Sequence, residues 1–307
     1  GHVGGESPMQ LGHLVPFGDI GGDPDTVRDY AQGLEALGYD FMEAPDHVLG
    51  ANAGSRPGWE AGRNTSDDLF HDPFVLLGYV TGIAPKLGFS TGVLIVAQRQ
   101  TALVAKQAAC LDVLCKGRFR LGIGVGWNEV EFVGLNENFH NRGRRSEEQA
   151  QVMEMLWANQ HVTFKGRYHT IDDAGINPRP ASGKVPLWYG GHHEKTLPRI
   201  AKWGDGWMPN AYPPDQTAIE IFSRLRRLTE AAGRDPASVG IEVWTSCGAG
   251  SAADWRKEAA FWQAAGASHI CLTTTFHRRH HHRIAGKSLS DHLAALKRYR
   301  DAVADFL

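Results

Sequence analysis

A carboxylate and an imidazole stand side by side at Asp46 and His47, where a short apolar run ends. Such a pair can donate, accept and shuttle protons near neutral pH, as a general acid or base must. Both side chains are therefore candidates for catalysis and for contact with a bound cofactor. The alternative is that Asp46 only caps the loop that follows.

Glycines mark two further places where a ligand could approach the backbone. Gly124 and Gly126 precede Trp127 at the end of an apolar run. A dinucleotide fingerprint needs a third glycine where Trp127 stands, so the run indicates close ligand contact or tight strand packing instead. Gly190 and Gly191 end another run and precede a helical pattern, where backbone N–H groups attract a phosphate. An ordinary turn is the alternative at that place.

Histidines are numerous, and four of them lie between His277 and His282. Two arginines interrupt this tract, and no carboxylate or cysteine stands nearby at ligand spacing, so no metal site is predicted. A solvated loop is expected, whose basic groups could meet an anionic cofactor tail or substrate. Neither a nucleophile-elbow motif nor a serine–histidine–aspartate order supports acyl transfer.

The order of the elements indicates how these residues could come together. Apolar runs alternate with helical patterns along the whole chain, which predicts a parallel sheet covered by helices. Eight such units favour a closed (β/α)₈ TIM barrel, and an open doubly wound sheet is the alternative. The expected strands span residues 11–17, 39–48, 87–96, 118–125, 187–189, 206–209, 241–246 and 269–275.

Barrel enzymes carry their chemistry at the C-terminal ends of the strands. Asp46, His47 and the two glycine sets fall at such ends, as do Trp207 and Met208 one unit after Gly191. Neighbouring late loops of a barrel often share a phosphate site, so Trp207 and Met208 join the cofactor-binding candidates.

The segment after the second strand, Leu49–His71, is too long for an ordinary connection. Such extended loops are usually lids or binding elements, and Trp59 could supply an aromatic wall to a substrate pocket. A surface insertion without such a role is the alternative.

Composition bounds the class of protein. Of 307 residues, 42% are hydrophobic and 21% charged, with a formal net charge of −2, which is typical of a globular protein and argues against nucleic-acid binding. Pro85 and Lys86 interrupt the longest apolar region, so no membrane span is expected. Four cysteines without a C-x-x-C pair fit a reducing, cytoplasmic location. Residues 1–8 are interpreted as a cloning remnant, and 9–307 as one domain.

Taken in order, several motifs resemble the luciferase-like monooxygenase superfamily over nearly all of the chain from Leu11 to Tyr299. They are the runs Phe70–Phe74, Leu87–Val93, Ala105–Asp112, Gly117–Glu129, Pro186–Gly191 and Gly204–Met208. The stretch from Gly124 to Glu131 and the segment from His281 to His292 look closest to the branch that uses the deazaflavin coenzyme F420.

The resemblance implies a TIM barrel that binds F420 or reduced FMN. It places Asp46 and His47 at the reactive face of the cofactor and Gly190–Gly191 at its phosphate. It places Gly92–Val93 at a site that is a non-prolyl cis peptide in many members and forms a bulge behind the tricyclic ring. Trp127 departs from relatives that carry a carboxylate there, which leaves His47 as the preferred acid or base.

The expected function is hydride transfer between coenzyme F420 and a small organic substrate, whose pocket includes Trp59 and Trp127. An FMN-dependent monooxygenase on the same fold is the alternative. A non-catalytic flavin-binding protein and a metal-dependent barrel hydrolase are alternatives from other classes. Because members of the family often dimerise, a homodimer is expected.

Overall fold

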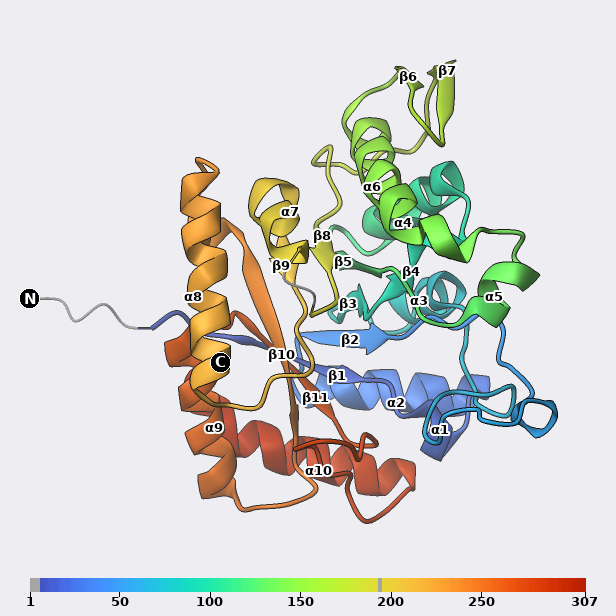
Figure 1. Ribbon diagram of the computed structural model, residues 1–307. Helices are drawn as coiled ribbons and strands as arrows, with labels where there is room; N and C mark the ends of the chain where they lie inside the picture. The colour runs from blue at the N-terminus through green and yellow to red at the C-terminus, as the bar shows by residue number, and fades with distance from the viewer. Residues whose placement is uncertain (1–5, 193–194) are drawn as a thin grey trace, which may run out of the picture.

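The computed structural model describes residues 6–192 and 195–307. Among these residues, eight parallel strands close into a barrel, because β3 pairs with β5 and β1 pairs with both β2 and β11 (Figure 1). The strands of the barrel are β1 (Gln10–Leu14), β2 (Phe41–Ala44), β3 (Gly88–Thr91), β5 (Phe119–Gly124), β8 (Leu187–Tyr189), β9 (Gly206–Trp207), β10 (Gly240–Ser246) and β11 (His269–Thr273). The predicted TIM barrel is confirmed.

Helices cover the outside of this barrel and begin at recognisable caps. Asp23 and Asp72 cap helices that have proline in the first turn, and Ser251 and Ser288 form capping boxes with the aspartates three residues later. The covering helices are α2 (Pro24–Ala36), α3 (Pro73–Thr81), α4 (Thr101–Leu114), α6 (Arg142–Ala158), α7 (Thr196–Trp203), α8 (Gln216–Ala231), α9 (Ala252–Ala265) and α10 (Leu289–Val303).

The third predicted strand is divided in two. β3 ends at Thr91, and the Gly92–Val93 peptide that follows is cis. β4 (Leu94–Ile95) then pairs in parallel with β5, and a short 3-10 helix, η2 (Val96–Gln98), follows it. The strands β1, β2 and β11 end a few residues before their predicted C-terminal ends. Phe17, the predicted last residue of the first strand, instead starts the short helix α1 (Phe17–Ile20). The predicted helical start at His193 lies outside the described residues.

A helix and a hairpin after β5 were also not predicted. The helix α5 (Glu129–Gly134) follows β5, and the antiparallel hairpin of β6 (Val162–Lys165) and β7 (Thr170–Ala174) stands off the barrel beyond α6 (Figure 1). The extended loop after β2 is confirmed, and it contains only one turn of 3-10 helix, η1 (Ala53–Ser55).

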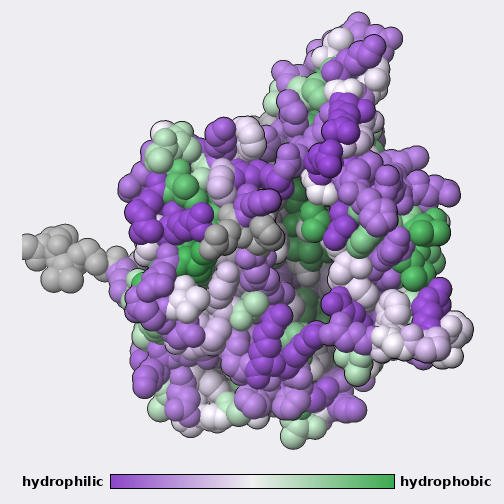
Figure 2. Space-filling view, viewed as in Figure 1, coloured by the Kyte–Doolittle hydropathy of each residue, from purple (hydrophilic) through white to green (hydrophobic). Residues whose placement is uncertain are grey.

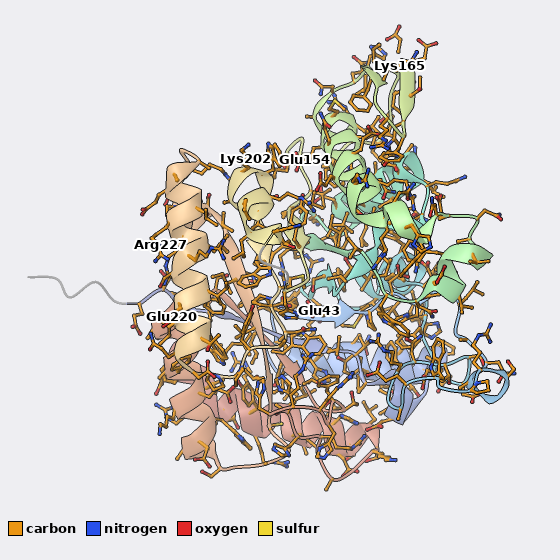
Figure 3. All side chains as sticks on the ribbon, in the orientation of Figure 1. Glu43, Glu154, Lys165, Lys202, Glu220 and Arg227 are labelled. Atoms are coloured by element: carbon orange, nitrogen blue, oxygen red, sulfur yellow. The ribbon has the colours of Figure 1, made fainter. Side chains whose placement is uncertain are left out.

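The barrel interior is unusually polar. Glu43, Ser90 and Glu242 are each completely buried there. Figure 3 shows Glu43 among the strands, whereas the labelled Lys202, Glu220 and Arg227 lie on the outer helices. Barrel interiors are more often filled by branched apolar side chains, so this polar layer calls for a local explanation, given below.

The face of the molecule seen in Figure 2 is mostly hydrophilic. In the parts of the chain that the structure describes, no helix is both long enough and apolar enough to cross a membrane.

Candidate active site

A cavity of about 600 Å³ opens at the C-terminal mouth of the barrel. Pockets for organic ligands commonly have this size and this position in TIM barrels. Residues of the loops after β1, β2, β5, β9 and β11 line it, together with Trp244 of β10. Of the predicted site residues, His47, Gly92 and Trp127 belong to its wall.

His47 is held by a buried carboxylate that sequence reasoning did not assign a role. Its Nδ1 lies 3.2 Å from an oxygen of Glu131, which is completely buried at the start of α5. The same carboxylate accepts the backbone N–H groups of Val48 at 2.8 Å and Leu49 at 3.3 Å. Because a carboxylate only accepts, Nδ1 carries the hydrogen, and Nε2 is the nitrogen left to meet a ligand. Glu131 thus fixes the orientation of the His47 ring.

The pKa of Glu131 is set by two opposed effects. Burial raises it, but the hydrogen bonds and charge of His47, with the N–H groups of Leu49 and Val48, bring it below its ordinary value. The carboxylate is therefore ionised, and its contribution to stability is lost only as the pH falls through this lowered pKa.

We expect Glu131→Gln to lower the free energy of unfolding by about 1.5–3 kcal/mol at neutral pH, since the charged hydrogen bonds are weakened. The deficit should fade as the pH falls through the lowered pKa of Glu131, where the wild-type carboxyl group also becomes protonated. Urea unfolding of both proteins from pH 7 to pH 3 measures it. A deficit that stays constant over this range would show that the charge of Glu131 is not involved.

Asp46 has a different environment from its neighbour His47. Its side chain is 1% exposed, accepts the N–H of Ile95 at 3.0 Å, and pairs with Arg99 at 2.7 Å. Arg99 also contacts Asp72, the N-cap of α3, at 3.0 Å. The carboxylate is thus occupied in joining β4 to α3, and it is not part of the cavity wall. This geometry assigns Asp46 a positioning role rather than proton transfer.

The cis peptide lies where several predicted cofactor residues meet. A Cβ placed on Gly124 would lie 2.5 Å from Cγ2 of Val93, and one placed on Gly190 would lie 2.9 Å from its Cγ1. Glycine is therefore required on both sides of the Val93 side chain. Gly92 faces the cavity, so the bulge presents backbone to whatever occupies the mouth.

Aromatic side chains gather around His47. The Trp127 ring lies 6.4 Å from His47, and the Trp59 ring lies 5.8 Å from Trp127. Phe70 approaches His47 to 4.7 Å, and the guanidinium of Arg63 stacks on Trp127 at 4.2 Å. The predicted Trp59 does not line the cavity itself; it contacts Trp127, which does. The loop after β2 instead contributes Phe70 to the cavity wall, a residue that sequence reasoning did not name as a site residue.

The Gly190–Gly191 turn keeps one of its two N–H groups occupied. Gly190 donates to the carbonyl of Ile123 at 2.8 Å, so an incoming phosphate would depend on Gly191 and the residues after it. Gly191 has φ of +95°, and nothing lies within 4 Å of a Cβ placed there. Trp207 donates its indole N–H to the Gly191 carbonyl, and Met208 packs against Gly122 inside the barrel. Trp207 and Met208 thus support the turn from behind.

A buried ionic cluster fills the barrel beneath the cavity. Glu43, Glu242 and Cys271 bring one ligand-type atom each to within 4.8 Å of one another. Arg120 pairs with Glu242 at 2.8 Å, and Ser90 donates to Glu43 at 2.7 Å, but the second oxygen of each glutamate has no hydrogen-bond partner. Three such groups could suit a metal ion, yet the guanidinium in contact with Glu242 opposes a cation.

A single proton bound by the two glutamates makes this cluster electrically neutral. Burial, followed by the charge of Glu43, raises the pKa of Glu242 well above its ordinary value. Two buried carboxyl groups beside one guanidinium are neutral as a set when the two share a single proton. Sequence reasoning missed the cluster, although a glutamate within the fully buried strand β2 was a visible signal.

The histidine tract after β11 is only partly solvated. His281 is 1% exposed and packs against Phe276 and Trp244 beside the cavity, so the prediction of a wholly solvated tract is wrong for this residue. Burial, with the neighbouring His280, lowers the pKa of His281 to about 4. Arg278 and Arg279 lie on the exposed side of the same segment and line the cavity.

The base of this segment is tied down by a buried hydrogen-bond chain. Thr274 Oγ1 contacts His13 at 2.8 Å and His292 at 2.9 Å, and His292 contacts Asp19 at 2.9 Å. Arg283 closes the chain on Asp19 at 2.6 Å. These bonds bring the pKa of Asp19 below its ordinary value although burial raises it. The segment therefore starts and ends at fixed points.

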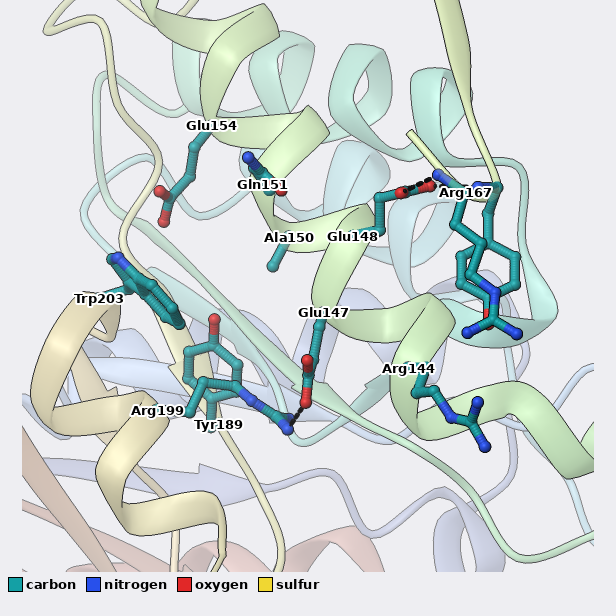
Figure 4. Close-up of a pocket in the computed structure, with 11 residues that line it drawn as sticks. Arg144, Glu147, Glu148, Ala150, Gln151, Glu154, Arg167, Tyr189, Arg199 and Trp203 are labelled. Carbon is teal, nitrogen blue, oxygen red and sulfur yellow. Dashed lines mark hydrogen bonds and ion pairs between the residues drawn. The ribbon is translucent and has the colours of Figure 1, made fainter. Parts of the chain in front are cut away.

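A second cavity, of about 470 Å³, lies outside the barrel wall between α6, α7 and the β6–β7 hairpin (Figure 4). Among its charged groups, Glu147 pairs with Arg199, and Glu148 accepts the backbone N–H groups of Arg167 and Tyr168. None of the predicted site residues line it. The mouth cavity is therefore the candidate active site.

Comparison with protein families gives one match that spans the described fold. The model of the family described as luciferase-like monooxygenase matches residues 9–305. The protein Rv0940c of Mycobacterium tuberculosis is 32% identical over 210 residues, which are 66% of this chain and 71% of that protein.

Two further relatives have names that state a reaction. The F420-dependent hydroxymycolic acid dehydrogenase of Mycobacterium tuberculosis is 28% identical over 219 residues, 70% of this chain and 57% of that protein. The pyrimidine monooxygenase RutA of Allorhizobium ampelinum is 30% identical over 247 residues, 74% of this chain and 64% of that protein.

Solved structures share the fold at low identity. An F420-dependent secondary alcohol dehydrogenase, in complex with an F420–acetone adduct, superposes with a TM-score of 0.76 at 20% identity, covering 97% of this chain and 99% of that one. The monooxygenase RslO1 of Streptomyces bottropensis gives 0.74 at 16% identity with the same coverage.

Proposed function

Because the chain belongs to the luciferase-like monooxygenase family, we propose that it is an oxidoreductase that binds coenzyme F420 in the mouth cavity. In this proposal it transfers a hydride between the deazaflavin and a small organic substrate. The observation that carries the proposal is the wall shared by the Gly92 backbone, the ring of Trp127 and the oriented imidazole of His47.

The described residues fit a flavin-type cofactor in two respects. The cavity has the volume of a pocket for an organic ligand, and a flat ring could lie on the backbone at Gly92. At the other end, nothing lies within 4 Å of a Cβ placed on Gly191, so a phosphate could come close to the backbone of this turn. The relative named as an F420-dependent dehydrogenase supports the choice of the deazaflavin.

When bound, the cofactor supplies a two-electron hydride chemistry that protein side chains lack. The residues of this chain then have three tasks. His47 gives or takes a proton at Nε2, while Glu131 holds its ring through Nδ1. Gly191 binds the phosphate, and Trp127, with Trp59 behind it, walls the substrate and excludes water. A homodimer and a cytoplasmic location stay predictions.

An FMN-dependent monooxygenase is the second candidate, and the relative named pyrimidine monooxygenase favours it. The same cavity would hold FMN, because the ring and the phosphate are spaced alike in both cofactors. A non-catalytic flavin-binding protein would use the same contacts without turnover, so activity distinguishes it.

Titration of the protein with F420 and with FMN, side by side, tests the proposal. We expect tight binding of F420, and binding of FMN alone would transfer the assignment to the second candidate. Gly191→Val should weaken binding about 10-fold or more, since a charged hydrogen bond to its N–H is worth roughly 1.5–3 kcal/mol. Gly183→Val is the matched control, because Gly183 also has a positive φ, +78°, in open space. Equal Kd values for the two variants would refute the role of Gly191.

A further inference from the structure

Arg279 combines three features, of which its neighbour Arg278 shares only the place in the cavity wall. Its φ of +57° lies in the left-handed region, which side-chain-bearing residues rarely adopt. Its side chain lines the mouth cavity. Among the described residues it makes no hydrogen bond or ion pair, whereas its neighbour Arg278 contacts Glu60 at 3.4 Å. Strained residues without a structural partner are found most often at binding sites.

The position of Arg279 is fixed rather than free. The segment that carries it is closed at its base by the contact of Ile284 N with Thr274 O at 3.0 Å and of Arg283 with Asp19 at 2.6 Å. The buried ring of His281 anchors it from below. A guanidinium held over a cavity in this way is preorganised for an anion, which reduces the entropy lost on binding.

The end of the cavity that Arg279 occupies is the one near Gly191. Arg279 and Asn210 line the same cavity, and the next residue, Ala211, donates its N–H to Nε2 of His192 at 3.0 Å. His192 directly follows Gly191. The pKa of His192 is lowered by burial and by the charge of Arg279, which is consistent with their proximity.

We propose that Arg279 is an anion-binding residue that contacts the phosphate of the bound cofactor from the side opposite Gly191. The inference rests on the proposed function, since it requires a flavin-type cofactor in the mouth cavity. A planar guanidinium offers two parallel donors that match a phosphate. The segment after β11 thereby spans the mouth, with Arg278 toward the loop after β2 and Arg279 toward the phosphate.

Paired ligands with and without the phosphate test this role. FMN is compared with riboflavin, and F420 is compared with the deazaflavin that bears the ribityl chain alone. Arg279→Ala should raise the Kd for the phosphorylated ligand about 10-fold and that for its partner less than about 2-fold, because an exposed charged hydrogen bond contributes near the lower end of its range. The increase in Kd for the phosphorylated ligand should be smaller in 1 M salt, where charges are screened within about 3 Å.

Two further variants separate charge from contact. Arg278→Ala removes the same charge from the adjacent residue and should change either Kd less than about 2-fold. Arg279→Lys keeps the charge without the planar fork and should recover part of the affinity. Thermal unfolding confirms that each variant is folded.

The outcomes are distinct. Failure of the wild-type protein to bind any of the four ligands would overturn the proposed function itself. If the wild type binds and Arg279→Ala leaves the Kd of the phosphorylated ligand unchanged, the role of Arg279 is overturned. An equal loss for both members of a ligand pair would overturn it as well, because the contact would then be to the ring or the ribityl chain.

Discussion

Replacing Arg120 with methionine is expected to lower the free energy of unfolding by about 3–5 kcal/mol at neutral pH. Arg120 is the cation that pairs with Glu242 in the buried cluster, and its guanidinium stacks on Phe41 at 4.6 Å and on Trp188 at 4.4 Å. Methionine keeps much of the volume but leaves a carboxylate without a counter-charge inside the barrel. The protein must then keep that charge unpaired or take up a second proton.

Urea unfolding at neutral and acidic pH measures this effect. The deficit of Arg120→Met should be smaller at pH 5 than at pH 7.5, since protonation of the orphaned carboxylate then costs less free energy. The triple variant Glu43→Gln, Arg120→Met and Glu242→Gln removes all three ionisable groups of the cluster and should recover most of the loss. A single variant within about 1 kcal/mol of the wild type would show that the cluster is already uncharged without Arg120.

Replacing His47 with alanine should lower kcat by about 10²–10⁴-fold, the usual contribution of a general acid or base. Cofactor affinity should change little, because the backbone of Gly92 and Gly191 provides the proposed contacts to the ring and phosphate. The rate is followed by cofactor absorbance with whichever of a panel of small alcohols and ketones supports turnover in the wild type.

Two comparisons make the result specific to the imidazole. His161→Ala removes an exposed histidine far from the mouth and should leave kcat unchanged. Glu131→Gln should cause a smaller loss than His47→Ala, since it disturbs only the orientation of the ring. Unchanged kcat in His47→Ala, with unchanged Kd, would rule out the acid–base role and direct attention to the cofactor or water.

Local patterns predicted the elements of this barrel well. The helix at 101–114 and the strand at 187–189 have the bounds expected from their apolar residues. The third strand was predicted as continuous from 87 to 96, because its apolar pattern runs through the segment; the cis peptide at Gly92–Val93 that divides it was indicated by the resemblance and not by the local pattern. The hairpin of β6 and β7 was missed since its residues are largely polar and exposed, which removes the periodic signal.

The candidate site was predicted less completely, because its decisive contacts join residues far apart in the chain. Asp46 and His47 were correctly placed at a strand end, but their different roles depend on Arg99 and Glu131, which lie 53 and 84 residues away. A single sequence shows which side chains are ionisable and does not show which of them will face each other. For the same reason the partner of Glu43, Glu242 on the far side of the barrel, could not be inferred.

The polar barrel interior also gives the folding reaction a proton stoichiometry. In the unfolded chain Glu242 is ionised at neutral pH, whereas in the folded barrel burial and the charge of Glu43 raise its pKa and favour its protonated form. Folding therefore takes up a proton, and a group whose pKa is raised on folding stabilises the native state most below its unfolded pKa. This part of the stability declines by up to about 1.4 kcal/mol per pH unit as the pH rises, until the folded pKa is passed. The barrel interior thus couples the stability of the whole chain to the proton concentration, although no solvent reaches it.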